Sequence, residues 1–134
     1  MHIAYICADG GIPVFGQKGC SIHVQETLRA FLRRGARVTL FASRIGGQPC
    51  VGLDDIKVIP LPRFQSQDKR EREREAFDRN KSIAHVIQQA GDFSMVYERF
   101  SLWSNAAMEW AQSTQESSIL EVNGPLIVEQ LLLR

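Results

Sequence analysis

The fold is decided by residues 3–35, which read IAYICADGGIPVFGQKGCSIHVQETLRAFLRRG. Residues 3–8 are apolar and predict a buried strand, after which a glycine-rich loop leads into an amphipathic helix. The helix is expected to open near Cys20 and Ser21 and to end at Gly35. Its first backbone N–H groups lack partners and lie at the positive end of the helix dipole. A strand, a loop and a helix in this order therefore predict a binding site for a phosphate or diphosphate.

The loop matches neither of two common phosphate-binding motifs. Its glycines at positions 10, 11, 16 and 19 do not have the Gly-x-Gly-x-x-Gly spacing of the dinucleotide fingerprint. Gly11 and Gly16 fit the nucleotide-triphosphate P-loop, but Gln17 stands where that motif requires lysine. The glycines also allow a simpler interpretation, in which they only let a surface loop turn.

Length and composition limit the class of protein. A chain of 134 residues is long enough for one domain with a core, and its formal net charge of +1 provides no global attraction for nucleic acid. The three cysteines lack the spacing of a zinc site or a disulfide framework. Because neither a secretory signal nor a membrane-length apolar run is present, we expect a cytoplasmic protein, and a peripheral membrane contact stays open.

The rest of the chain predicts strands that alternate with helices. Strands are expected at residues 38–41, 56–59, 93–97 and 119–122, and helices from the charged run 69–75 to Gly91 and at residues 104–111. This order implies a Rossmann-like α/β fold, doubly wound, with a mostly parallel sheet of about five strands and helices on both faces. Phe77, Trp103 and Trp110 are expected to face the core.

Ligands of such sheets gather beyond the carboxyl ends of the strands, where polar residues follow two of the predicted strands. Glu98 and Arg99 follow the fourth strand, and they either pair with each other, cap the next helix or contact a ligand. Glu121 and Asn123 end the fifth strand. A carboxylate in an otherwise apolar strand requires a partner, so Glu121 is expected to have one.

Four separated segments occur in a recognisable order, namely IAYICA at 3–8, FGQKGCSIHVQE at 15–26, VYERFSL at 96–102 and LEVNGPL at 120–126. Together they resemble the N-terminal domain of family 4 (group 1) glycosyltransferases. The resemblance runs from the first strand to the end of the chain. It implies a GT-B enzyme, in which two Rossmann-like domains move a sugar from a nucleotide-diphosphate donor to an acceptor with retention of configuration.

In that family the C-terminal domain holds most of the nucleotide and the main catalytic residues, and the N-terminal domain supplies the glycine loop and most of the acceptor surface. Residues 1–134 then correspond to the N-terminal domain alone. We expect this chain to be inactive without a C-terminal half, which the apolar segment 126–134, stopping abruptly, also suggests. The resemblance implies no cofactor and no metal.

The resemblance also assigns candidate site residues. Gly16, Gly19 and Lys18 match the loop that approaches the donor diphosphate. The residues matched to acceptor or sugar contacts are His23, Glu98, Arg99, Glu121 and Asn123. Many relatives carry histidine where Asn123 stands, and asparagine can donate a hydrogen bond to a sugar but cannot act as a general acid or base. The donor nucleotide, the sugar and the acceptor are not readable from the sequence.

Two other readings of the sequence stay open. The alternating pattern also suits a self-sufficient flavodoxin-like or nucleotide-binding module without transferase activity. A non-catalytic interaction domain derived from such an enzyme is the third.

Overall fold

A computed structural model describes residues 1–132 and has five parallel strands in the order β3-β2-β1-β4-β5. The strands are β1 (His2–Cys7), β2 (Arg37–Ala42), β3 (Lys57–Pro60), β4 (Met95–Arg99) and β5 (Ser117–Glu121). The helices are α1 (Gly19–Arg33), α2 (Lys69–Ala90), α3 (Ala106–Thr114) and α4 (Leu126–Leu132). The predicted α/β fold is confirmed, and the sheet is parallel throughout. The predicted segment 126–134 is described up to residue 132, and the last two residues lie outside the described part.

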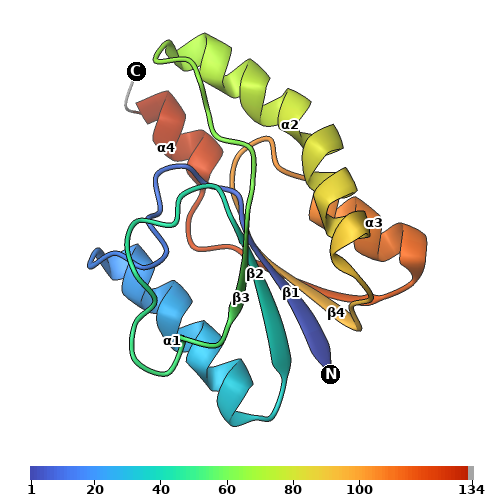
Figure 1. The fold of residues 1–134 in the computed structure, drawn as a ribbon. Coiled ribbons are helices and arrows are strands. Elements are labelled where there is room, and N and C mark those ends of the chain that lie inside the picture. The colour runs from blue at the N-terminus through green and yellow to red at the C-terminus, as the bar shows by residue number, and fades with distance from the viewer. Residues whose placement is uncertain (133–134) are drawn as a thin grey trace.

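The direction in which successive strands are added to the sheet reverses once. It builds β1, β2 and β3 outward in one direction and then returns to place β4 on the other side of β1 (Figure 1). In this register Cys7 lies between Ala42 and Arg99, and Arg99 lies beside Glu121. The carboxyl ends of β1 and β4 therefore form a topological switch point, which is where open α/β sheets usually bind ligands.

Helix α1 covers one face of the sheet. Its buried residues include Val24 and Leu28, which belong to the same apolar cluster as Tyr5 and Leu40 on the central strands. The helix ends at a glycine because Gly35 has a φ of 80°, a left-handed conformation that side chains with a Cβ rarely adopt.

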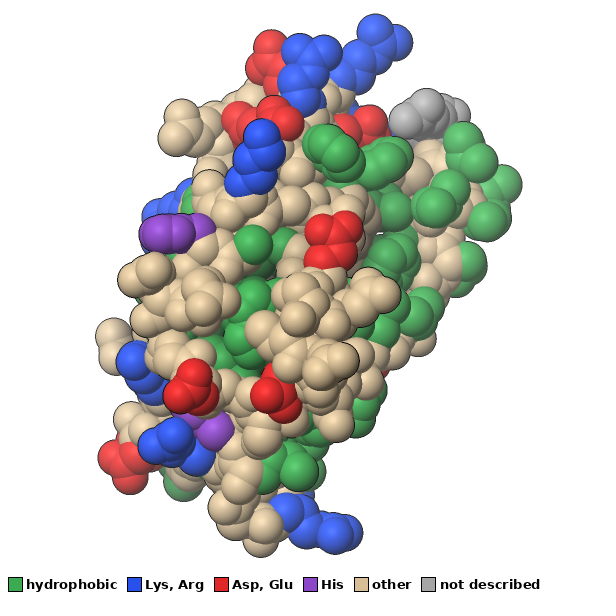
Figure 2. All heavy atoms as spheres, turned by 90° about the vertical axis from the view of Figure 1, so that its right-hand side faces the viewer, with side chains coloured by type: hydrophobic (Ala, Val, Ile, Leu, Met, Phe, Trp, Pro, Cys, Tyr) green, Lys and Arg blue, Asp and Glu red, His purple; other side chains and the backbone are tan. Residues whose placement is uncertain are grey.

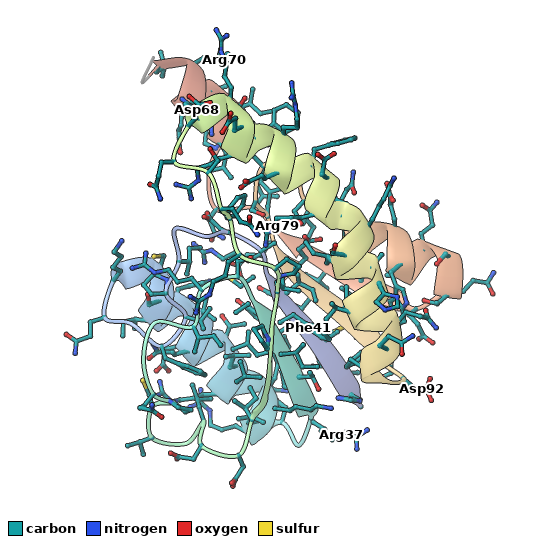
Figure 3. The ribbon with its side chains drawn as sticks, turned by 45° about the horizontal axis from the view of Figure 1, so that its top comes forward. Arg37, Phe41, Asp68, Arg70, Arg79 and Asp92 are labelled. Carbon is teal, nitrogen blue, oxygen red and sulfur yellow. The ribbon has the colours of Figure 1, made fainter. Side chains whose placement is uncertain are left out.

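Helices α2 and α3 cover the opposite face. Ile83 and Ile87 of α2 pack with Ala107 of α3 and with Phe41 of β2 in a second apolar cluster. Figure 3 shows Arg79 between α2 and the sheet, on the same side of the helix as this cluster, while Arg70 points away from the molecule. Helix α2 begins after Asp68, whose side chain accepts the N–H of Glu71 at 3.0 Å.

Two aromatic residues do not face the core as predicted. Phe77 is 60% exposed, because the buried face of α2 follows Arg79, Ile83 and Ile87 and leaves Phe77 on the outer side. Trp103 is 48% exposed and has a φ of 69°, since it lies in a turn before α3 rather than on the helix. The other tryptophan, in α3, is partly buried and packs against Phe93 as expected.

The two edges of the sheet differ. The β3 edge is four residues long, starts with Lys57 and ends with Pro60, which has no N–H to donate. The β5 edge contains neither lysine nor proline, and four of its five residues are exposed. Figure 2 shows hydrophobic side chains along the right-hand edge of the molecule. The exposed apolar residues of β5, α4 and the link between them are Ile119, Leu120, Val122, Ile127, Val128, Leu131 and Leu132.

None of the helices described between residues 1 and 132 is long and apolar enough to cross a membrane.

Candidate functional site

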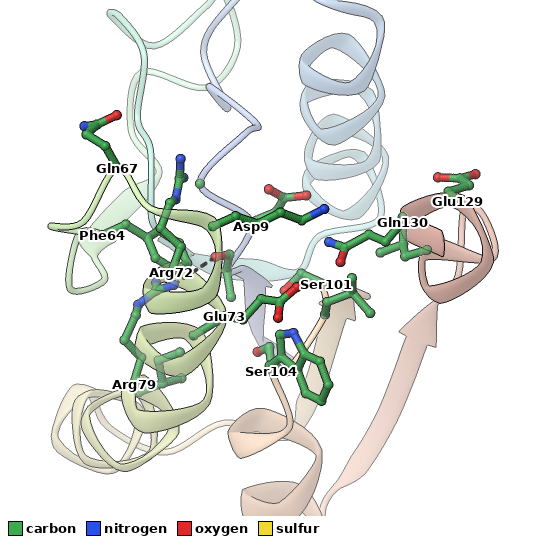
Figure 4. A pocket seen from close by; sticks show the side chains of 18 residues that line it. Asp9, Phe64, Gln67, Arg72, Glu73, Arg79, Ser101, Ser104, Glu129 and Gln130 are labelled. Carbon is green, nitrogen blue, oxygen red and sulfur yellow. Dashed lines mark hydrogen bonds between the residues drawn. The ribbon is translucent and has the colours of Figure 1, made fainter. Parts of the chain in front are cut away.

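A cavity of about 420 Å³ lies at the switch point, beyond the carboxyl ends of β1 and β4 (Figure 4). We call it the switch cavity. It is lined by Ala8–Gly10 after β1, by 101–104 after β4, by one side of α2 with the preceding Phe64, and by α4. Its volume is within the range of small-molecule sites. Topology alone therefore brings four segments, far apart in the sequence, around one hollow.

Arg79 is the most deeply buried charged residue in the wall of the switch cavity, with 8% of its surface exposed. Its Nη2 donates to the Ser43 hydroxyl, its Nη1 donates to the Ala8 carbonyl at 3.4 Å, and its Nε has no hydrogen-bond partner within residues 1–132. Burial lowers the pKa of its guanidinium from the usual value, and Glu75 opposes this shift.

Phe64 connects Arg79 to the loop after β1. The Arg79 guanidinium lies 4.1 Å from the centre of the Phe64 ring, and the Arg72 guanidinium lies 5.1 Å from it. Gly10 permits this arrangement, because a Cβ at this position would come within 2.9 Å of the ring. The aromatic ring thus holds two arginines beside the backbone at the end of β1.

Glu98 lies on the same face of the sheet as α2 and α3, and only 1% of it is exposed. Its Oε1 accepts from the Ser104 hydroxyl at 2.8 Å, and in the described part of the chain its Oε2 has no partner. Burial raises the pKa of this carboxyl to about 7, although the hydrogen bond from Ser104 lowers it. Neither structural alternative predicted for Glu98 is correct. It does not pair with Arg99, and the amides at the start of α3 donate to Asn80 instead.

Arg99 and Glu98 point to opposite faces because consecutive side chains of a strand alternate. Arg99 therefore meets the end of β5 on the α1 face, where its Nη1 donates to Glu121 Oε1 at 3.1 Å. His23 Nε2 lies 3.0 Å from the same oxygen, and Asn123 donates to it at 2.6 Å. The Tyr97 hydroxyl donates to the other oxygen. We call these five residues the Glu121 cluster.

The Glu121 cluster confirms that this carboxylate has partners, and residues 1–132 supply four of them. Burial acts to raise the pKa of Glu121, but hydrogen bonds from Tyr97, Asn123 and His23 outweigh burial, so the pKa is lowered. The carboxylate is therefore stabilised in its charged form. Four predicted site residues are brought together here, and Glu98 is separate from them on the other face of the sheet.

The glycine loop is held by its own hydrogen bonds. The N–H of Gly16 donates to the Pro13 carbonyl at 2.8 Å, so the expectation that this amide is open to a diphosphate is wrong for this structure. A Cβ at Gly16 would lie 2.9 Å from Pro13, which explains the glycine as a close contact. Gln25, which sequence reasoning missed, is buried and donates to the carbonyls of Val14 and Gly16 at 2.8 and 2.9 Å.

The start of α1 is open. Within residues 1–132 no acceptor is found for the backbone N–H groups of Gly19, Cys20 and Ser21, and Lys18 at the N-cap gives no side-chain hydrogen bond to the helix. Lys18 and Gly19 are exposed. Because α1 follows β1, these amides lie at the carboxyl edge of the sheet, one turn before His23 of the Glu121 cluster. The amides of Gly19 and Cys20 can donate to an anion there, whereas Ser21 is fully buried.

Sequence reasoning missed most of the switch cavity. Arg79 was missed because it lies in a helix rich in charged residues. The available signal was its spacing, three residues after Ala76 and four before Ile83, which places it on the buried side of α2. Phe64 gave no signal, because it lies in an irregular segment between β3 and α2. In the part of the chain that the structure describes, no three His, Cys, Asp or Glu side chains are placed to hold a metal ion.

No protein-family model and no curated protein matches this sequence. Among solved structures, the fold is similar to the C-terminal domain of a hydrogenase from Pyrococcus furiosus, with a TM-score of 0.58 and 17% identity over 90% of this chain and 91% of that domain. It is also similar to a ugt transferase from Siraitia grosvenorii in complex with UDP, with a TM-score of 0.57 and 12% identity. That match covers 90% of this chain and 27% of the transferase chain. At these identities the likeness shows the fold alone, a Rossmann-like α/β fold that matches one half of a GT-B fold.

Proposed function

We propose that this chain is the acceptor-side half of a retaining glycosyltransferase of the GT-B type, related to family 4. In this proposal a nucleotide-diphosphate sugar donates the sugar, and a second Rossmann-like domain of the same protein holds most of the nucleotide and supplies the main catalytic residues. The reaction requires no metal or other cofactor and takes place in the cytoplasm. The chain alone binds its ligands weakly and transfers no sugar.

The observation that carries the proposal is the open start of α1 at the carboxyl edge of the sheet. The unpaired amides of Gly19 and Cys20, which are exposed and half-buried, are fixed donors at the positive end of a helix of 15 residues. As a sugar leaves its donor, negative charge grows on the diphosphate, and fixed N–H donors stabilise that charge without rearrangement. The similar fold of a transferase in complex with UDP supports this choice of ligand.

The neighbouring groups have distinct parts in the proposal. Lys18 is exposed and adds a positive charge at the helix start. The Glu121 cluster orients His23 and Asn123, and Asn123 positions a sugar hydroxyl without moving a proton. The switch cavity receives the acceptor, because it is a hollow of suitable size at the switch point of the same sheet. Glu98 is buried and is not a lining residue of the cavity, but Ser104, which donates to it, is.

Gly19→Glu tests the diphosphate site. Nothing lies within 4 Å of a Cβ at Gly19, so the larger side chain fits, and its carboxylate repels an anion at the helix start. We expect UDP to shift the NMR signals of the amides at positions 19 and 20 in the original chain and not in Gly19→Glu. The control is Gln112→Glu, which adds the same charge at an exposed position of α3 without straining the backbone and leaves the shifts in place. Equal binding of UDP by all three proteins would contradict the proposal.

Activity provides a second test. The purified chain is incubated with a panel of nucleotide-diphosphate sugars, and the gene is sequenced beyond codon 134. We expect no transfer by the chain alone and, in the gene, a second Rossmann-like half with two spaced glutamates. Sugar transfer by the chain alone, or tight stoichiometric binding of flavin or of a nucleotide, would instead favour a self-sufficient module.

A further inference from the structure

Arg79 presents an imbalance of charge. A buried cation is normally paired with a carboxylate, because removing it from water is costly. Within residues 1–132 no carboxylate lies within ion-pair distance of Arg79, and its hydrogen-bond partners are a carbonyl and a hydroxyl. Glu75 acts on it electrostatically, but the Glu75 oxygens accept the N–H groups of Gln65 and Ser66 at 3.0 Å. The guanidinium thus keeps a net positive charge inside the protein.

The switch cavity supplies the space for a compensating anion. Arg79 is part of its wall, and Lys69 and Arg72 line it from the same side of α2. The guanidinium groups of Arg72 and Arg79 both contact the ring of Phe64. Planar guanidinium groups bind phosphate and carboxylate oxygens in pairs of hydrogen bonds.

The carboxylates around the cavity are distributed unevenly. Asp9 Oδ1 accepts the N–H of Gly11 at 2.7 Å, which turns one of its oxygens toward its own loop. Glu129 lies on α4, and Figure 4 shows it across the cavity from Arg72 and Arg79, pointing away from them. Glu73 points toward the centre of the cavity in the same view. On α2 the cavity is lined by three cations, Lys69, Arg72 and Arg79, and by one carboxylate, Glu73, so this side carries an excess of positive charge.

We propose that the switch cavity binds a small anionic molecule through a phosphate ester or a carboxylate, held by Arg79 and Arg72. In the proposed transferase, on which this reading rests, the molecule is the acceptor, so the acceptor carries a negative charge. The anionic group replaces the missing counter-charge of Arg79, and the remainder of the molecule lies toward Trp103 at the mouth of the cavity. A neutral sugar of the same size leaves the guanidinium unpaired and binds more weakly.

The test is a titration of the whole chain with glucose 6-phosphate, glucuronate and glucose, followed by NMR. The two anionic sugars distinguish a phosphate ester from a carboxylate, and glucose is the neutral control. We expect at least one anionic sugar to shift the amides of Ala8, Gly10 and Phe64 and to bind roughly tenfold or more tightly than glucose, as expected for one charge-assisted hydrogen bond. Equal affinity for all three sugars, or shifts confined to other residues, would overturn the proposal.

Matched variants locate the charge. Arg72→Gln removes an exposed cavity cation without a core contact, and Arg74→Gln makes the same change on the same helix outside the cavity. Arg72→Gln is expected to lower the affinity for the anionic sugar about tenfold, and Arg74→Gln to leave it within twofold. If both variants bind alike, the cavity is not the anion site. Arg79→Lys keeps the positive charge but loses the planar guanidinium that forms paired hydrogen bonds. Circular dichroism verifies that this variant is folded. An unchanged affinity for the anionic sugar would then also contradict the assignment.

The two proposals fail separately. UDP reports on the amides at the start of α1, whereas the sugar anions report on Ala8, Gly10 and Phe64. Loss of the UDP response alone removes the donor site and leaves an anion-binding module. Loss of the sugar-anion response alone leaves the transferase proposal with a neutral acceptor.

Discussion

Glu98 is a buried carboxyl group with an unpartnered oxygen, so its protonation affects stability. In the folded protein it keeps its proton up to about pH 7, whereas an ordinary glutamate releases it near 4.5. A raised pKa in the folded state gives stability that is complete below pH 4.5 and is lost as the pH rises through 7. The folded protein should therefore lose stability over this interval because of Glu98.

Glu98→Gln removes that loss, because the amide does not ionise. We compare the free energy of unfolding of Glu98→Gln with that of the original chain at each pH. From pH 4 to pH 8 this difference should change by about 3 kcal/mol in favour of the variant. Urea unfolding at several pH values measures this. The comparison uses the difference between the two proteins, since other groups titrate in both. If this difference stays constant from pH 4 to pH 8, the pKa of Glu98 is not raised in the folded protein.

Glu121 is the shared acceptor of four donors. Glu121→Ala leaves the Arg99 guanidinium, whose side chain is 12% exposed, without its carboxylate. We expect a loss of about 2–4 kcal/mol in free energy of unfolding, because a poorly solvated charge becomes unpaired. The control is Glu26→Ala, which breaks an ion pair with Arg29 where the glutamate side chain is 54% exposed. That change should cost less than about 0.5 kcal/mol. Equal losses would show that the Glu121 cluster is not a structural centre.

At the level of the element, the loop before α1 and the first turn of α1 each contain a glycine, and the two have different requirements. Gly16→Ala places a Cβ 2.9 Å from Pro13 and should destabilise the protein by about 1–2 kcal/mol. Gly19→Ala meets nothing within 4 Å, lies in the first turn of a helix and should be neutral or stabilising by up to about 1 kcal/mol. Thermal unfolding of the two variants measures both effects. A stable Gly16→Ala protein would show that the loop adapts to the larger residue.

The sequence predicted the elements well where periodicity was strong. The helix from residue 19 to 33, the central strands and the parallel order follow from apolar spacing and from a glycine at the end of α1. The predictions that Phe77 and Trp103 face the core were wrong, because the presence of an aromatic residue does not indicate which side of a helix or turn is buried. The charged start of α2 gave no sign that Arg79, a few residues later, turns inward.

The candidate site was predicted in part for a similar reason. Residues that end strands at one edge can be found from the strands themselves, and Arg99, Glu121 and Asn123 do meet there. Consecutive strand residues face opposite sides, but the predicted strand ended at residue 97 and β4 continues to Arg99, so the separation of Glu98 from Arg99 was not foreseen. Gln25 and Phe64 act through contacts across long stretches of chain, which spacing does not encode.

For the whole molecule, burial is greatest at β1 and least at β5 and α4. Residues 3–7 of β1 are buried, whereas the strand β5 and the helix α4 contain no buried residue. We expect the β1 amides to exchange with solvent only on global unfolding, and the α4 amides to exchange at least about 100-fold faster. Hydrogen exchange followed by NMR measures this. Similar protection in both elements would require a contact that covers α4 in solution.

Because the two edges of the sheet differ, a further strand can be added at only one of them. Proline and lysine close the β3 margin, while a further strand laid beside β5 would find a full row of backbone partners and apolar side chains above and below it. Fusions, inserted segments or complementing peptides should consequently be attached on the β5 side, where the polypeptide is receptive. The same additions beside β3 would meet a backbone that lacks a donor at Pro60.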